Sequence, residues 1–177
     1  MFKVYLDPFD GEPDDADEFY ALVGRCTILW GHVDTTVEGM LSYLMDIPSA
    51  AEVREPEIPI SFKRKMRLWR KAYNRMPELA DAKSAAIKFA NEAARLSEQR
   101  QTIIHSTIAF EKKEPKARGI RYRQRGDKTL YWQFRISKDY LTRHMNELQN
   151  LLRMLDFPAM HALFLIVSIN YQKQSKR

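Results

Sequence analysis

The chain has 177 residues, of which 45% are hydrophobic and 29% are charged. This composition suits one globular domain with a sizeable core and excludes an intrinsically disordered chain. No run of about 18 apolar residues is present, so we expect no transmembrane helix and no membrane partner. The N-terminus lacks the apolar core of a signal peptide, and the single cysteine, Cys26, excludes an internal disulfide framework. We therefore expect a cytoplasmic protein.

The net charge of +6 is distributed unevenly along the chain. Residues 1–60 carry 13 acidic and 3 basic side chains, whereas residues 61–177 carry 10 acidic and 26 basic ones. A basic segment of this length favours an anionic partner, and nucleic acid is the first candidate. An ordinary solvated surface, partly neutralised by the acidic segment, explains the same charge, and the composition does not separate these two readings.

The first predicted element is a helix from about Asp14 to Met45, in which apolar residues recur every three or four positions. Gly24 and Gly31 are seven residues apart and share one face of this helix. Because glycine costs a helix up to about 1 kcal/mol relative to alanine, we expect another backbone to approach this face closely. Cys26 lies in the apolar stripe, which favours a packing role over a catalytic one.

Two more helices are predicted before the middle of the chain. The second runs from about Ser61 to Met76, with one apolar stripe and with basic residues, Lys65 among them, on the remaining faces. The third follows Pro77 and reaches to about Phe110. Arg100 falls on the apolar line of this third helix, where a guanidinium requires a buried acceptor, a cleft or an interface.

A β-hairpin is predicted over residues 117–136, because side chains alternate from Arg118 to Ile136 around the turn residues Arg125-Gly126-Asp127. Basic and aromatic side chains are interleaved along it, as on surfaces that contact phosphates and stack bases. Charge that protects a sheet edge against aggregation explains the same pattern, so both interpretations stay open at this point.

The last part of the chain is again helical in pattern. A fourth helix is expected from about Ser137, with a seam formed by Leu141, Met145, Leu148, Leu152 and Leu155. The residues Asp156-Phe157-Pro158 are expected to end it and to start a fifth, mostly apolar helix through Ile169. Residues Met1 to Leu6 are a candidate for a short extra strand.

These elements together predict a mainly α fold. We expect an antiparallel up-and-down helical bundle of four to five helices with an inserted basic β-hairpin, in a single domain that spans residues 1–177. No metal or cofactor motif is visible, because the four histidines are scattered and no HExxH, cysteine pair or glycine-rich phosphate loop is present. We therefore expect neither a metal nor a cofactor.

One pair of residues remains that is able to carry chemistry. Arg100 and His105, at the end of a long helix, resemble the Arg-x(4–6)-His signature of HEPN domains (higher eukaryotes and prokaryotes nucleotide-binding). The resemblance covers residues 14–155 as a pattern of helices, with Glu98 as the acidic residue two positions before the arginine. The chain departs from the common form of the motif, because Gln101 follows the arginine and Ser106 stands where glycine is frequent.

The resemblance implies a homodimer in which two Arg–His pairs face one cleft. Many members of the family are metal-independent endoribonucleases of defence or toxin–antitoxin systems, and others are non-catalytic. In an active member Arg100 would bind the scissile phosphate and His105 would act as general acid or base. On a straight helix these two side chains point about 140° apart, so they converge only if the helix distorts or two subunits contribute. Arg25 and His32 match the same spacing and are either a second polar element or an exposed pair.

RNA is the expected partner, held by the basic second helix and by the hairpin. The candidate RNA-binding residues are Arg64, Arg67, Arg70, Lys71, Arg118, Arg121, Arg123, Arg125, Tyr122 and Trp132. The alternative function is a non-catalytic helical dimerisation module whose basic surface binds an acidic protein partner, such as an antitoxin-like protein.

Overall fold

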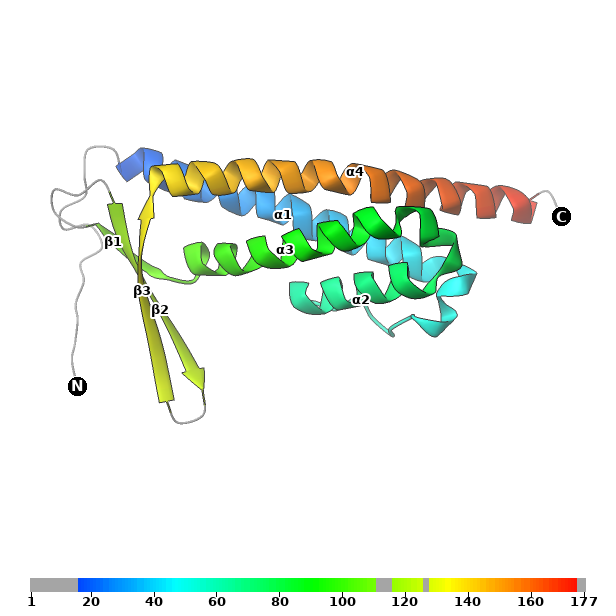
Figure 1. Cartoon of the computed structure of the whole chain (residues 1–177), viewed down its shortest axis with the longest axis horizontal. Coiled ribbons are helices and arrows are strands. Elements are labelled where there is room, and N and C mark those ends of the chain that lie inside the picture. Colours follow the sequence, from blue (N-terminus) through cyan, green and yellow to red (C-terminus); the bar gives the residue numbers. More distant parts are fainter. Residues whose placement is uncertain (1–15, 111–115, 126–127, 175–177) are drawn as a thin grey trace. The chain divides into compact units, whose positions relative to one another are not determined.

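The computed structural model describes residues 16–110, 116–125 and 128–174, except for the side chains of residues 107, 109, 116, 123–125, 128 and 157–174. The chain is mainly helical and forms a helical bundle with an inserted hairpin, as predicted (Figure 1). The elements are α1 (Ala16–Asp46), η1 (Pro48–Glu52), α2 (Phe62–Arg75), η2 (Pro77–Ala82), α3 (Lys83–Ile104), β1 (Thr107–Phe110), β2 (Lys116–Arg125), β3 (Lys128–Ser137) and α4 (Lys138–Gln174). No helix within the described residues has both the length and the apolar character needed to cross a membrane.

The chain divides into two compact units. The sheet unit consists of Met1–Leu29 and Glu98–Glu147, and the helical unit consists of Trp30–Ser97 and Leu148–Arg177. Helices α1, α3 and α4 each contribute residues to both units. The strands belong to the sheet unit, whereas α2 belongs to the helical unit.

The helical unit is organised around Trp69 of α2, which is fully buried. The Trp69 ring contacts the rings of Tyr73 and Phe89 at centroid distances of 4.9 and 5.4 Å. The indole Nε1 donates a hydrogen bond to the Ala86 carbonyl at 3.0 Å, so the polar atom of this side chain is satisfied within the core. Helix α2 begins after Ser61, whose hydroxyl accepts a hydrogen bond from the Arg64 amide and caps the helix. The predicted bounds of α2 are confirmed to within one residue.

Lys65 is buried in the helical unit, although the sequence pattern placed it on an outward face of α2. Its Nζ donates to Asp34 Oδ1 and to Glu38 Oε2, both at 2.6 Å. Burial by itself would lower the pKa of Lys65, but the hydrogen bonds and charges of the two carboxylates raise that pKa above its ordinary value. The two acidic residues are four positions apart on α1 and therefore share a face, which makes room for one buried ammonium.

The sheet unit holds an antiparallel sheet with the strand order β1-β2-β3. The predicted hairpin is confirmed, with Lys116 opposite Ser137 at one end and Arg125 opposite Lys128 at the other. One face of the sheet packs on helices around a buried cluster formed by Phe19, Leu22, Ile103, Ala117, Ile136 and Leu141. On the other face Arg118, Tyr122, Tyr131 and Arg135 are exposed.

Strand β1 corrects the predicted third helix, which was expected to reach Phe110. Helix α3 ends at Ile104, and Thr107–Phe110 pair with β2 in an antiparallel register. Ile108 and Phe110 pack against the buried cluster of the sheet unit. This alternation suits a strand, and pairing with a distant partner outweighs the local helical pattern.

Helix α4 also differs from the prediction, because it continues without a break from Lys138 to Gln174. Pro158 was expected to start a separate helix. Proline adopts the helical φ and removes one backbone hydrogen bond. The other hydrogen bonds of this long helix are sufficient to continue it through Pro158. The buried residues of α4 are Leu141, His144, Leu148, Leu151 and Leu155, whereas the predicted seam residues Met145 and Leu152 are only partly buried.

The glycines of α1 do not mark a close approach of another backbone. A Cβ atom added at Gly24 or Gly31 would meet no described atom within 4 Å, so this expectation was wrong. Gly119 in β2 is different, because a Cβ there would overlap the ring of Phe134 on the neighbouring strand. The predicted strand at Met1–Leu6 and the turn residues Gly126 and Asp127 lie outside the described residues.

Candidate nucleic-acid interface

The outer face of the β2–β3 hairpin carries three consecutive cross-strand pairs. These pairs are Arg118 with Arg135, Ile120 with Gln133, and Tyr122 with Tyr131. Side chains alternate along a strand, so these pairs lie on the face opposite to the core residues Ala117 and Ile136. Arg118 and Arg135 are both exposed.

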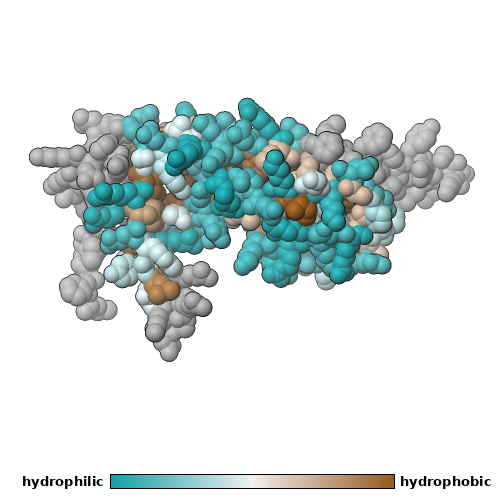
Figure 2. Space-filling view, in the orientation of Figure 1, coloured by the Kyte–Doolittle hydropathy of each residue, from teal (hydrophilic) through white to brown (hydrophobic). Residues whose placement is uncertain are grey.

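The two tyrosines of this outer face are exposed to solvent to 63% and 66%. Leu130 and Trp132 are also exposed, although they belong to the other face. Figure 2 shows this concentration of apolar and near-neutral residues on the described part of the hairpin, while hydrophilic residues predominate on the helices in the same view. Exposed aromatic side chains that gather in one place are typical of a binding surface.

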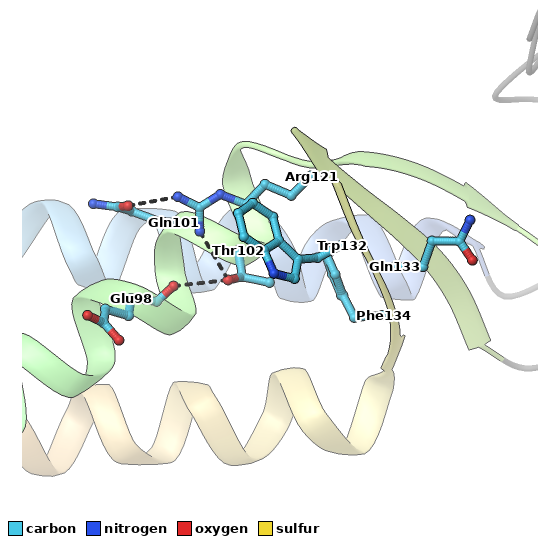
Figure 3. Close-up of a pocket in the computed structure, with 7 residues that line it drawn as sticks. All are labelled: Glu98, Gln101, Thr102, Arg121, Trp132, Gln133 and Phe134. Carbon is cyan, nitrogen blue, oxygen red and sulfur yellow. Dashed lines mark hydrogen bonds between the residues drawn. The ribbon is translucent and has the colours of Figure 1, made fainter. Parts of the chain in front are cut away.

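A pocket of about 500 Å³ lies on the inner side of the hairpin, within the sheet unit. It is lined by Glu98, Gln101, Thr102, Arg121, Trp132, Gln133 and Phe134. Arg121 and Trp132 are directly opposite each other on β2 and β3. Figure 3 shows both side chains directed toward the last turns of α3, whereas Gln133 points away.

Arg121 is held in this pocket by two side chains of α3. Its Nη2 donates to Gln101 Oε1 at 3.0 Å and its Nη1 to Thr102 Oγ1 at 3.4 Å. Thr102 in turn donates to the Glu98 carbonyl at 3.1 Å, so its hydroxyl is used as both donor and acceptor (Figure 3). The two hydrogen bonds from Arg121 connect β2 to the end of α3 and orient the Arg121 guanidinium.

The two predicted catalytic residues occupy different environments at the end of α3. Arg100 lies on the helix and is half-buried, and its buried Nε has no hydrogen-bond partner among the residues that the structure describes. His105 follows the last residue of the helix and is exposed, and its amide donates to the Gln101 carbonyl at 3.1 Å. No hydrogen bond joins the two side chains within the described part of one chain.

A second polar group in the sheet unit was missed by the sequence analysis. His144 of α4 is buried, and its Nδ1 lies 3.1 Å from Gln99 Oε1, next to Arg100 in the chain. The Tyr140 ring stacks on His144 in a nearly parallel orientation. His144 is three residues after Leu141 and four before Leu148, so the 3-4 spacing was the signal that places it on the buried side of α4.

The four candidate residues of α2 form two pairs, one that is exposed and one whose side chains make hydrogen bonds to neighbouring elements. Arg64 and Arg67 are exposed, and Arg64 lies 3.7 Å from Glu55. Arg70 donates to the Ala90 carbonyl and to Asn91 Oδ1, and Lys71 donates to the Val53 carbonyl. The last two side chains therefore stabilise the helical unit, and their contact with RNA stays a prediction.

The remaining candidate residues lie on β2 and on α1. Arg123 and Arg125 belong to β2, but their side chains lie outside the described residues. Arg25 and His32 are both exposed on α1.

Among the residues that the structure describes, neither a thiol nor a metal centre forms part of this candidate interface. Cys26 is buried, as predicted, and its thiol lies 3.6 Å from the Leu141 carbonyl. Burial raises the pKa of Cys26 to about 11, so the thiol stays protonated at neutral pH. No group of three or more histidine, cysteine or acidic residues is placed to hold a metal within residues 16–110, 116–125 and 128–174.

Comparison with protein-family models, with curated proteins and with solved structures finds no match for this chain. The HEPN likeness is therefore a resemblance in pattern, and the roles that it implies stay predictions.

Proposed function

We propose that this protein binds single-stranded RNA on the outer face of the β2–β3 hairpin. The observation that carries the proposal is the directly paired, exposed Tyr122 and Tyr131, with Arg118 and Arg135 on the same face. Base–aromatic stacking contributes roughly 1–3 kcal/mol per base, and arginines beside the rings contact the phosphates. The net charge of +6 favours approach of the polyanion.

Arg118 and Arg135 are opposite each other on neighbouring strands of this face, and both are exposed. Their guanidinium groups are therefore accessible to phosphates of a strand that lies along the hairpin, with which they would form charge-assisted hydrogen bonds. The ligand is single-stranded in this proposal, because aromatic rings reach only bases that are not already stacked in a duplex.

The test is fluorescence anisotropy with a labelled single-stranded RNA and the same RNA annealed to its complement. We expect the single strand to bind more tightly, and the double variant Tyr122→Ala/Tyr131→Ala to lose about tenfold or more in affinity. The matched control is Tyr43→Ala, which removes a tyrosine that is 53% exposed from α1 in the helical unit. Unchanged binding by the hairpin variant, or no binding by the wild type, would contradict the proposal.

A second candidate function is metal-independent cleavage of the bound RNA in a homodimer. The observation that favours it is Arg100 itself, which is half-buried and whose buried Nε lacks a partner among the described residues of one chain, so part of its guanidinium remains accessible to a phosphate. In this scheme His105 takes the proton of a ribose 2′-hydroxyl while the 2′-oxygen attacks phosphorus. The 5′-oxygen leaves with a proton that it takes from water, the product is a 2′,3′-cyclic phosphate, and Arg100 stabilises the charge on the phosphate oxygens.

Incubation of labelled RNA with the protein in excess chelator tests this second function. Cleavage that is lost in His105→Ala and kept in His32→Ala would support it, because both histidines are exposed and only one follows Arg100. Light scattering at micromolar concentration measures whether the homodimer exists. Absence of cleavage would contradict the enzyme and leave RNA binding, whereas binding of an acidic protein in place of RNA would favour the interaction module.

A further inference from the structure

We propose that the pocket beside Trp132 binds one guanine base of the RNA strand. This inference rests on the proposed function, because it assigns the pocket to the same ligand, and it adds a base preference that stacking on Tyr122 and Tyr131 does not supply. Stacking is tolerant of sequence, since every base has an aromatic face, whereas hydrogen bonds to base edges discriminate.

The path from the outer face to the pocket crosses the free edge of β3. In the described sheet β3 pairs only with β2, so its other side is an edge. Gln133 belongs to the outer face of β3 by its register with Ile120, yet it also lines the pocket. A strand whose bases stack on the outer tyrosines therefore reaches the pocket by wrapping over one β-strand.

Trp132 provides a stacking platform at this position. Its side chain is 45% exposed, whereas the other two tryptophans, Trp30 and Trp69, are buried in the helical unit. The pocket volume of about 500 Å³ is large enough for a nucleobase. Figure 3 shows the indole beside the guanidinium of Arg121, so a base on this platform would lie within reach of that group.

The polar groups around the platform have unused hydrogen-bonding capacity of both kinds. Among the described residues Arg121 uses two of its five N–H groups, on Gln101 and Thr102, which leaves three able to donate to a ligand. Gln101 accepts from Arg121 through its carbonyl oxygen, which leaves its amide NH2 as a donor. Glu98, one turn before Gln101, also lines the pocket, and its carboxylate has two acceptor oxygens. Figure 3 shows this carboxylate directed away from Trp132, so the exposed side chain has to rotate to bring its oxygens to a base on the platform.

Guanine matches this set of groups better than the other three bases. Its O6 and N7 are two adjacent acceptors that suit an arginine, and its N1–H and 2-amino group are two adjacent donors that suit one carboxylate. Adenine places an amino donor where guanine has O6, and its unprotonated N1 would face the carboxylate. The pyrimidines have a single ring, so they cover less of Trp132 and lack the N7 acceptor.

The experiment measures anisotropy with four labelled RNA octamers that differ at one central position, U4-X-U3, in which X is G, A, C or U. A single variable base avoids the self-association of G-rich strands. We expect the octamer with G to bind the wild-type protein about tenfold more tightly than the octamer with A. Quenching of tryptophan fluorescence by the G octamer gives an independent readout, since Trp132 is the exposed tryptophan.

Glu98→Gln tests the pairing with the donor edge of guanine. This surface substitution on α3 should reduce the preference for G over A to about twofold or less, measured as the ratio of the two dissociation constants. An octamer with inosine, which lacks the 2-amino group, should bind the wild type less tightly than G and should bind Glu98→Gln equally to G. Glu78→Gln, which changes an exposed carboxylate of η2, is the matched control.

The outcomes distinguish the guanine pocket from RNA binding on the outer face of the hairpin. Equal affinities for the four octamers, or a guanine preference that survives Glu98→Gln, would overturn the guanine pocket and leave RNA binding on the outer face standing. Absence of binding to every octamer would overturn the proposed function and the pocket together.

Discussion

Helix α2 and the β2–β3 hairpin both combine basic and aromatic side chains, and the structure places these side chains in opposite environments. In α2, Trp69 and Tyr73 are buried, and Lys65 is buried with them in contact with two carboxylates. In the hairpin, Tyr122 and Tyr131 are exposed beside arginines that are also exposed. The comparison shows that similar residues build a core when they recur at helical spacing and an exposed surface when they alternate along a strand whose outer face carries exposed side chains.

The largest expected difference between the two regions concerns their tryptophans. Trp69→Ala should lower the free energy of unfolding by about 3–5 kcal/mol, because it opens a cavity beside Tyr73 and Phe89 and removes the hydrogen bond to Ala86. Trp132→Ala removes the same side chain from an exposed position and should change stability by less than about 1 kcal/mol. Urea denaturation followed by circular dichroism measures both. Similar losses for the two variants would break the comparison.

The next effect concerns the buried ammonium of Lys65. Lys65→Ala should cost about 1–3 kcal/mol of unfolding free energy, because it leaves Asp34 and Glu38 close together without their cation. Arg67→Ala, which removes an exposed cation from the same helix, should leave the unfolding free energy nearly unchanged.

The pH dependence of this interaction follows from the raised pKa of Lys65. A pKa that is higher in the folded state gives a stabilisation that is complete at neutral pH and is lost as the pH rises through the raised value. The wild type should therefore lose its stability advantage over Lys65→Ala only in strongly alkaline solution. A constant difference between the two proteins at all pH values would contradict the assignment.

The glycines give an effect of opposite sign in strand and helix. Gly119→Ala should destabilise by about 1–3 kcal/mol, because the added methyl group overlaps the ring of Phe134. Gly31→Ala adds a methyl group in open space on α1 and should stabilise by roughly 0.5–1 kcal/mol. Thermal melts measure both shifts. A destabilised Gly31→Ala would indicate that a partner backbone covers this face after all.

The smallest effect concerns the rate at which the thiol of the single cysteine, Cys26, reacts with a labelling reagent. Because burial raises the pKa of Cys26 to about 11, the reactive thiolate is rare at pH 7.5. Labelling with a disulfide reagent should be slow in the native protein and fast in denaturant. Rapid native labelling at neutral pH would contradict the buried position of the thiol.

Local chemistry allowed much of this fold to be predicted from the sequence. The 3-4 spacing of Met66, Trp69 and Tyr73 predicted α2, and the alternation around residues 117–136 predicted the hairpin. Features that depend on distant partners were missed. Lys65 is paired with residues 27 and 31 positions away, and β1 is a strand because it pairs with β2.

The candidate site was predictable only in part, for the same reason. The outer face of the hairpin follows from alternation once the register is known. The pocket does not, because it requires α3 to end at Ile104 and the chain to turn back so that Arg121 reaches Gln101. The burial of His144 was visible in its spacing, whereas its contact with Gln99, 45 positions earlier, was not.

The central claim is that RNA binds on the outer face of the hairpin, where Arg118 and Arg135 contact its phosphates. The salt dependence of the dissociation constant tests it directly, since each phosphate contact contributes a slope of about 0.7 for a single strand. The account predicts that Arg118→Gln/Arg135→Gln reduces the log–log slope by about 1.4, whereas Arg64→Gln/Arg67→Gln leaves the slope nearly unchanged. An unchanged slope in the hairpin variant, together with a reduced slope in the α2 variant, would contradict it.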